Sequence, residues 1–354
     1  VAAALLKDEG YEVIGAFMRL GTPQGVELAE SCSSDGRKHK QGCCSVLDAD
    51  DARRVAAVLD IPLYVLNFQD DFGKVIDYFI DEYNRGRTPN PCVRCNDWLK
   101  FGKLAKYAEA VGADFVASGH YARIGTDPVS NERALMRGVD HKKDQSYVLF
   151  GMTRQTMART LLPIGALEKT RVRELAEQYH LPTFSKPDSQ EICFVPNQDY
   201  AGLMRRRSPH AFKAGELVTA EGTVVGTHEG HQQFTIGQRK GVGVAFGYPI
   251  YVVDIDSENN RVTVGEKAAL MKRTLRARQT NLLSTRARGA ENLRCVAKIR
   301  YNSPPQDARL SVIGDDEIEV AFDAPQAAIT PGQAVVCFDG DVVLGGGWIE
   351  SSSA

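Results

Sequence analysis

Several features that would place a chain in a special class of proteins are missing from this sequence. None of its apolar stretches approaches the roughly 20 residues that a membrane-spanning helix needs, so we expect no membrane span. Its eight cysteines among 354 residues are too few for a secreted domain held by disulfides, and they suit a reducing cytoplasm. The net charge of −2 gives no overall attraction to nucleic acid. The sequence therefore predicts a globular protein of the cytoplasm.

A recognisable start is missing as well. The first residue is Val1, and residues 1–6 already have the apolar pattern of a helix that runs to Gly10. No charged start followed by an apolar centre and a small-residue cleavage site marks a secretory signal. We therefore expect the chain to open inside a structural element, with residues missing upstream.

The length of the chain is sufficient for two or three hydrophobic cores. From residue 12 to about residue 122, short apolar runs alternate with amphipathic stretches, which is typical of parallel strands joined by helices. Residues 21–41 show no periodicity and are expected to form a loop. Strands are expected at 13–18, 63–67 and 114–118, and helices at 50–59, 72–83, around Trp98 and at 169–179.

Beyond about residue 196, the pattern changes to short β-rich runs separated by glycine turns. This part of the sequence predicts an all-β module or a pair of such modules. Strands are expected at 217–219, 251–254, 261–264, 295–301, 318–322 and 334–338, with tight turns at 315–316 and 339–340.

The strongest cluster of reactive residue types lies at residues 86–96, where Cys92 and Cys95 follow two prolines. Because the prolines favour an extended approach, we expect Cys95 at or near a helix N-terminus, where the helix dipole favours a thiolate. Cys95 is therefore a candidate nucleophile or metal ligand. Half of a zinc site and inert packing remain alternatives, although a structural zinc site needs four ligands and no second Cys-x-x-Cys motif is present.

Three other motifs carry groups suited to binding. Gly119 and His120 follow a predicted parallel strand, at the edge where α/β sheets bind ligands, although a structural histidine explains His120 as well. Cys193 lies in a polar stretch at 185–194, where a lone cysteine is usually a small core residue. The string at 142–147 offers two cations and an amide.

Three further strings carry positive charge. The glycine-rich string at 235–243 presents two adjacent cations and is either a phosphate-binding loop or a hairpin rim. The runs at 205–207 and 272–278 are more often solvated faces than binding sites.

Taken together and in this order, these motifs resemble the tRNA-specific 2-thiouridylase family, over nearly the whole chain from the first helix to the Gly-Gly-Gly-Trp-Ile-Glu string at 345–350. The resemblance implies an α/β fold. Its parts are an ATP-pyrophosphatase (adenine nucleotide alpha hydrolase-like) parallel-sheet domain over residues 1–196, a small central domain over 197–264 and a C-terminal β-barrel over 265–354. It also implies an ATP- and Mg²⁺-dependent sulfurtransferase that forms 2-thiouridine at the wobble position of tRNA.

The resemblance assigns roles to individual residues by motif. Cys95 corresponds to the family's nucleophile, Cys193 to the cysteine that carries the persulfide, and Met18 and Gly119 to the nucleotide site. The implied partners are the anticodon arm of tRNA and a protein that donates persulfide sulfur, and the chain is expected to be a monomer. Positions matching the target-base contact are Asn90, Pro91 and Cys92, and those matching tRNA contacts are His120, Lys143, Asp144, Gln145, Arg300, Tyr301 and Gln333.

Two departures from the family pattern leave alternatives open. The Ser-Gly-Gly-Val-Asp-Ser-Ser phosphate loop of the family does not occur in this sequence, so a non-catalytic tRNA-binding remnant is one alternative. Many members carry aspartate at the position of Cys92, and a third cysteine makes a 4Fe-4S cluster on Cys92, Cys95 and Cys193 another. A disulfide between Cys95 and Cys193 during turnover is the favoured hypothesis.

Overall fold

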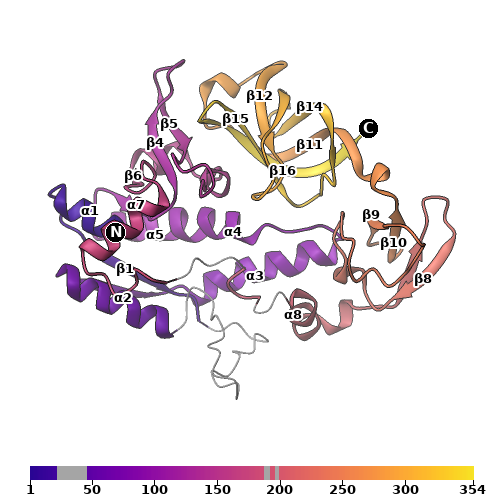
Figure 1. Ribbon diagram of the computed structural model, residues 1–354, viewed down its shortest axis with the longest axis horizontal. Helices are drawn as coiled ribbons and strands as arrows, with labels where there is room; N and C mark the ends of the chain where they lie inside the picture. The colour runs from indigo at the N-terminus through magenta and orange to yellow at the C-terminus, as the bar shows by residue number, and fades with distance from the viewer. Residues whose placement is uncertain (22–45, 187–191, 196–198) are drawn as a thin grey trace. The chain divides into compact units, whose positions relative to one another are not determined.

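The computed structural model describes residues 1–21, 46–186, 192–195 and 199–354 (Figure 1). Its contacts divide the chain into two compact units, which we describe separately. The α/β unit consists of Val1–Val75, Cys92–Thr126 and Leu135–Leu203, and the β unit consists of Ile76–Pro91, Asp127–Ala134 and Met204–Ala354.

The α/β unit contains the parallel strand pairs that the alternating pattern predicts. Strand β1 (Gly15–Arg19) pairs in parallel with β2 (Leu63–Asn67), and helix α2 (Val46–Leu59) lies between them in the chain. Strand β3 (Val116–Ala117) pairs in parallel with β6 (Thr160–Leu161). The other elements that begin in this unit are α1 (Ala2–Asp8), α3 (Gln69–Asn84), α5 (Leu104–Ala110), β4 (Ala122–Thr126), η2 (Ser146–Leu149), α6 (Arg154–Ala158), α7 (Lys169–Gln178) and α8 (Tyr200–Arg207).

The β unit holds a small sheet and a closed barrel. The small sheet has the strand order β8-β7-β10-β9 and a core of Leu217, Val252 and Val262.

The six barrel strands follow the order β11-β14-β13-β12-β15-β16, and the additional pairing of β11 with β16 closes the ring. The sheet strands are β7 (Gly215–Val218), β8 (Val224–His228), β9 (Tyr251–Asp256) and β10 (Arg261–Gly265). The barrel strands are β11 (Met271–Asn281), β12 (Leu293–Lys298), β13 (Gln306–Gly314), β14 (Glu317–Ala327), β15 (Ala334–Asp339) and β16 (Val342–Ser353).

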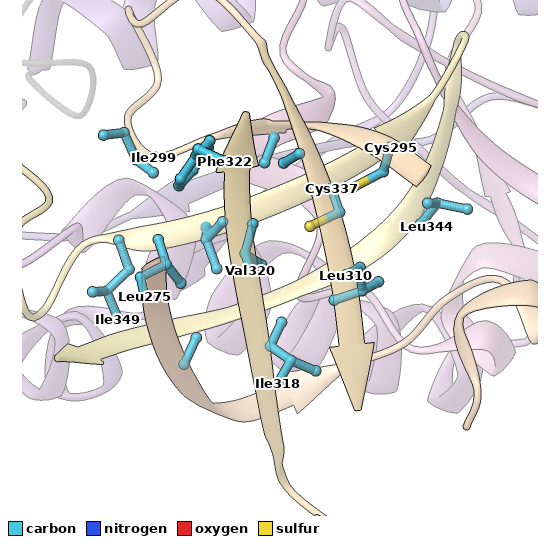
Figure 2. Close-up of a cluster of buried hydrophobic side chains, with 14 of the residues drawn as sticks. Leu275, Cys295, Ile299, Leu310, Ile318, Val320, Phe322, Cys337, Leu344 and Ile349 are labelled. Atoms are coloured by element: carbon cyan, nitrogen blue, oxygen red, sulfur yellow. The ribbon is translucent and has the colours of Figure 1, made fainter. Parts of the chain in front are cut away.

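The barrel interior is filled by alternate residues of its strands (Figure 2). Along β14, Ile318, Val320 and Phe322 are buried while the residues between them are not, which is the period of two that a strand with one buried face requires. The thiols of Cys295 and Cys337 lie in the same cluster, and they form a hydrogen bond with each other. These two cysteines are therefore packing residues of the barrel.

The expected fold class is confirmed, with local corrections. The chain beyond residue 196 is not all β, because residues 200–207 form helix α8, which buries Leu203 and Met204. The strand expected at 295–301 ends at Lys298, since Ser303 and Arg300 bond to each other in a turn. Nearly all of the loop expected at 21–41 lies outside the described residues. None of the described helices is both long and apolar enough to cross a membrane.

Candidate active site

The segment that carries Cys92 and Cys95 is one continuous helix. It begins with α4 (Pro91–Arg94), continues as a π-helix, η1 (Cys95–Lys103), and ends as α5. Proline suits the first turn of a helix because its missing N–H is not needed there. Sequence reasoning expected Cys95 near the helix N-terminus, whereas Cys92 lies in the first turn and Cys95 begins the π-helix one turn later.

The π-helical geometry has a visible cause at Gly102. The backbone N–H of Leu104 bonds to the carbonyl of Leu99, five residues earlier, as a π-helix requires. A Cβ atom at Gly102 would lie only 2.7 Å from the carbonyl oxygen of Asp97, which is also five residues earlier. Glycine therefore permits the close spacing of the turns that directly follow Cys95.

Polar contacts fix the first turns of this helix. Asn96 is buried, and its amide nitrogen donates to the carbonyl of Val148 at 3.0 Å. The Arg94 guanidinium lies 5.2 Å from the centre of the Trp98 ring and 4.0 Å from the Asp97 carboxylate. Burial raises the pKa of Asp97, and Arg94 only partly counteracts this effect. A guanidinium and a carboxyl group of raised pKa thus flank partly buried Cys95 in the sequence.

Cys193 belongs to the short described segment 192–195. Cys193 is partly buried. The ring of the next residue, Phe194, packs edge to face against the ring of Phe72 at a centroid distance of 5.6 Å. Upstream, the Lys186 ammonium lies 2.6 Å from the Asp48 carboxylate and 2.7 Å from that of Asp51. None of the five cysteines within the described ranges is in a disulfide.

The strand-end motif lies beside the cysteine helix. His120 is buried; its Nδ1 contacts the Ser118 hydroxyl and its Nε2 lies 3.5 Å from the Lys100 ammonium on η1. The Phe101 and His120 rings are 5.9 Å apart. Burial, and secondly Lys100, hold the pKa of His120 well below its ordinary value of 6.5, so the ring is neutral near pH 7.

Gly119 has open space in front of its Cα. A Cβ atom there would meet nothing closer than the Ile164 side chain at 3.9 Å. A ligand can therefore approach the backbone closely at this strand end, which fits a nucleotide. Met18, the second residue assigned to nucleotide binding, is partly buried on β1.

The string at 143–145 braces its own backbone. The buried Asp144 carboxylate accepts hydrogen bonds from Gly138 N at 3.1 Å and from the backbone and hydroxyl of Ser146. The Gln145 side-chain oxygen accepts from the backbone N–H of Tyr121 at 2.9 Å. Lys143 is partly buried. The amide side chain of Gln145 thus holds the residue that follows His120, while the Asp144 carboxylate fixes the backbone on either side of the string.

In the β unit, the segment before Cys92 is fastened to the barrel. The Arg87 guanidinium binds Glu82 at 2.8 Å and both carboxylate oxygens of Glu350 at 2.8 and 2.9 Å. The Gln333 amide donates to the carbonyls of Thr88 at 3.2 Å and Pro89 at 2.9 Å. Although burial lowers it, the pKa of Arg87 is raised overall by these carboxylates. Sequence reasoning missed this clamp, since residues 82, 87 and 350 share no local pattern.

Two further predicted contact residues support the same region. Arg300 donates to the Thr330 hydroxyl at 2.9 Å and to the Ala328 carbonyl, shortly before Gln333 in the chain. The Tyr301 ring lies 5.8 Å from the Lys298 ammonium. The structure therefore gathers Gln333, Arg300 and the segment that includes Asn90 and Pro91 in the β unit, and it gathers His120 and the cysteine helix in the α/β unit.

The three thiols of the iron–sulfur alternative do not form a ligand set. Within the described ranges, no group of three or more His, Cys, Asp or Glu side chains is arranged to hold a metal ion. Cys92, Cys95 and Cys193 all lie in these ranges.

Comparisons with known proteins agree with this architecture. Residues 1–197 match the model of the family described as tRNA methyl transferase HUP domain, residues 207–266 its PRC-barrel domain, and residues 272–349 the aminomethyltransferase beta-barrel domain.

Similar curated proteins bear the name tRNA-specific 2-thiouridylase MnmA. The protein of Carboxydothermus hydrogenoformans is 48% identical over 99% of this chain and 94% of its own length. That of Clostridioides difficile is 46% identical over 99% and 95%, and that of Rhodopirellula baltica 46% over 99% and 92%. With this identity over almost its whole length, the chain belongs to the tRNA-specific 2-thiouridylase family.

Proposed function

We propose that this chain transfers sulfur, in an ATP-dependent reaction, to C2 of the wobble uridine of tRNA. The observation that carries the proposal is the likeness over 99% of the chain to relatives named for this activity. The partly buried cysteine at the start of a π-helix supports it, because such helices often occur at functional sites. The proposal includes a monomeric cytoplasmic enzyme, with domain boundaries near residues 196 and 264.

The chemistry follows from the weak electrophilicity of the uridine C2 carbonyl, whose oxygen is a poor leaving group. The C2 oxygen attacks the α-phosphorus of ATP, the bond between the α- and β-phosphates breaks, and pyrophosphate leaves an adenylate on that oxygen; Mg²⁺ would screen the phosphates. The terminal sulfur of a persulfide on Cys193, loaded by a donor protein, forms the C2–S bond while the C2–O bond breaks and AMP leaves. The Cys95 thiolate then attacks the Cys193 sulfur and releases the thiouridine. The bond between the Cys193 sulfur and the sulfur on C2 breaks, and a Cys95–Cys193 disulfide forms. A thiol reductant then restores both cysteines.

The other residues of the α/β unit hold the reactants. Gly119 leaves room for the nucleotide at the end of β3, and Met18 would line the same site from β1. His120 is neutral, so it serves as a hydrogen-bonding group toward tRNA and not as a cation. Lys100, at 3.5 Å from His120, supplies the positive charge. Lys143 would meet tRNA phosphate from the string that braces Tyr121.

The clamp in the β unit positions the target-base segment. Arg87 and Gln333 hold the backbone at 87–89, directly before Asn90, Pro91 and Cys92. A uridine must leave its stack to reach the sulfur, and a fixed segment beside it reduces the entropy lost on binding.

The test is formation of 2-thiouridine by the purified chain with tRNA, ATP, Mg²⁺ and a persulfide-bearing protein, measured by mass spectrometry of the nucleosides. Cys95→Ser and Cys193→Ser should each abolish the product while tRNA binding persists. Single turnover without reductant should yield a peptide pair linked through residues 95 and 193. Thiolation by either serine variant at the original rate would refute the relay, and tRNA binding with no ATP-dependent thiolation would favour the remnant hypothesis.

Cys92→Asp separates the relay from the cluster hypothesis. A relay through Cys95 and Cys193 should still form 2-thiouridine in this variant, because the thiol of Cys92 takes no part in the electron balance. A cluster held by three thiolates would lose a ligand, and with it both iron content and activity.

A further inference from the structure

The loop at residues 238–248 of the β unit presents two adjacent exposed cations near its start. The side chains of Arg239 and Lys240 have no hydrogen-bond or ion-pair partner among the residues that the structure describes. Two adjacent cations without a carboxylate partner keep their full charge available for an anion in solution.

The backbone of this loop is held on both sides of the cations. Gln238 accepts from the backbone N–H of Thr235 at 3.1 Å and donates to the Lys240 carbonyl at 3.0 Å. The next apolar residue, Val242, is buried in the core of the small sheet. The cations therefore project from a fixed turn, which lowers the entropy lost when they bind a ligand.

Aromatic rings follow in the same loop. Phe246 packs against the core of the small sheet, and the Tyr248 ring lies 5.8 Å from it. Tyr248 is nevertheless 50% exposed. An exposed ring beside a partly buried neighbour is suited to stacking on an unpaired base, and with adjacent cations it has the composition of a single-strand RNA contact.

In the other arginine-rich runs of the β unit, by contrast, several arginines are paired with carboxylates. Arg207 lies 2.6 Å from Asp77. On the barrel, Arg276 lies 3.4 Å from Glu319, and Arg278 lies 3.1 Å from Glu317. The charges of these arginines are compensated by carboxylates on the same surface. The charges of Arg239 and Lys240 have no such partner among the described residues.

The loop also borders a predicted contact residue. At Gly237, a Cβ atom would lie 3.8 Å from the Arg300 guanidinium and 2.8 Å from the Ala328 side chain. The backbone N–H of Gly237 donates to the Val252 carbonyl at 2.8 Å. The base of the loop thus lies against Arg300, so a tRNA bound at Arg300 would extend toward Arg239 and Lys240.

We propose that residues 239–248 form a second tRNA-contacting surface, in which Arg239 and Lys240 bind backbone phosphates and Tyr248 stacks on an unpaired base. This inference rests on the proposed function, because it takes tRNA as the partner.

The experiment measures tRNA affinity of the full chain as a function of KCl at constant Mg²⁺. Arg239→Gln with Lys240→Gln should weaken binding roughly tenfold and reduce the slope of log K against log salt by about 1 to 2, as expected for two lost phosphate contacts. Tyr248→Ala should weaken binding about fivefold with the slope unchanged. The matched control, Arg276→Gln with Arg278→Gln, removes the same charge from paired arginines and should leave the slope within 0.3 or so of the original.

The outcomes are distinguishable. If the unaltered chain binds tRNA but the glutamine pair at 239 and 240 has the same affinity and slope, the surface assignment is wrong and the proposed function stands. If that pair binds tRNA normally but no longer takes up sulfur from the donor protein, the loop is a protein-docking surface and the RNA assignment is also wrong. Absence of tRNA binding by the unaltered chain would overturn the function itself. Protection of Lys240 from acetylation by bound tRNA tests the contact without any substitution.

Discussion

At the scale of single residues, burial determines the ionisation of His120. Its ring is 7% exposed and lies 3.5 Å from the Lys100 ammonium, and both circumstances disfavour protonation. Of the two, burial is the larger cause of its low pKa. The His120 ring is thus a neutral hydrogen-bond donor or acceptor at physiological pH.

Lys100→Met should raise the pKa of His120 but leave it below 6.5, because the substitution removes the lesser cause and retains the burial. The measurement is a pH titration of the His120 ring resonances by NMR in both proteins. An unchanged pKa in the variant would show that Lys100 does not act on the ring, and a value above 6.5 would show that burial is not the main cause.

His228 makes a separate prediction about acid stability. Burial, and secondly the nearby His231, lower its pKa below 6.5 in the folded protein. An unfolded histidine takes up its proton near 6.5, so below this pH the unfolded state binds more protons and the free energy of unfolding falls. The loss is up to about 1.4 kcal/mol per pH unit between 6.5 and the folded-state pKa, and it is absent above that window.

His228→Gln should remove this dependence, since glutamine does not titrate. Urea unfolding at about pH 7.5 and about pH 5.5 should show a difference in unfolding free energy that is smaller in the variant than in the unaltered chain. Equal differences in the two proteins would mean that His228 takes up its proton equally in the folded and unfolded states.

At the scale of the secondary-structure elements, Gly102 is required by the π-helix that begins at Cys95. Glycine in an ordinary helix interior costs about 1 kcal/mol relative to alanine, so its replacement by alanine normally stabilises. At Gly102, the added methyl would lie 2.7 Å from the Asp97 carbonyl oxygen, which real contacts do not allow. At this position, replacement by alanine should therefore lower the free energy of unfolding instead of raising it.

Gly102→Ala should lower the free energy of unfolding by about 1–3 kcal/mol and slow sulfur transfer, because the turn after Cys95 must shift. Gly73→Ala in α3 is the matched control: a methyl there meets nothing within 4 Å, so it should stabilise by about 0.5–1 kcal/mol. Denaturant unfolding and the thiolation rate measure both effects. Stabilisation by both alanines would show that η1 relaxes to an ordinary α-helix at no cost.

The elements that were predictable are those with a strong local pattern. Strand β2 spans the expected residues 63–67, and β10 lies within one residue of its predicted bounds, because apolar runs flanked by turn residues define them. The π-helix was not predictable, since its wider turn leaves no distinct spacing in nine residues. In β16, a Cβ atom at Gly347 would approach the Arg278 carbonyl to 3.1 Å, and one at Gly345 would approach the Asn281 carbonyl to 2.4 Å. Close contact between β11 and β16 explains the glycines at 345 and 347.

The candidate site shows the same division. The chemical types at residues 95, 120 and 193 could be selected from motifs, because a thiol or an imidazole is visible in the sequence. Their partners were not visible: Lys100 beside His120 lies 20 residues away in the chain, and Glu350 lies 263 residues from Arg87. Only folding brings such pairs together, so local patterns carry no record of them.

At the scale of the whole molecule, the β unit is assembled from three separate parts of the chain. Its segment Ile76–Pro91 contributes Tyr78, whose ring packs against Trp348 at 5.9 Å. Its segment Asp127–Ala134 contributes Asp127, which binds Arg286 at 3.4 Å. Burial raises the pKa of Asp127, but the Val129 backbone N–H and the Arg286 guanidinium together hold it below its ordinary value. Segments inserted from the first half of the sequence thus supply an aromatic contact and an ion pair to the β unit.

This assembly predicts that the two units respond differently to loss of the Arg87 clamp. The sequence has two tryptophans, Trp98 in the α/β unit and Trp348 in the β unit, so Trp98→Phe and Trp348→Phe each leave one fluorescent reporter. Arg87→Ala leaves the buried Glu82 carboxylate with only the exposed Arg85 guanidinium at 3.9 Å, which should cost about 2–3 kcal/mol in the transition reported by Trp348.

Glu350→Gln is the milder control, because this carboxylate is 38% exposed and its loss leaves Arg87 bound to Glu82; it should cost below about 1 kcal/mol. The transition reported by Trp98 should shift less than that reported by Trp348 when Arg87 is replaced, because all three groups of the clamp belong to the β unit. Equal shifts from both reporters would mean that the chain unfolds as one cooperative block, in which the clamp stabilises both units alike.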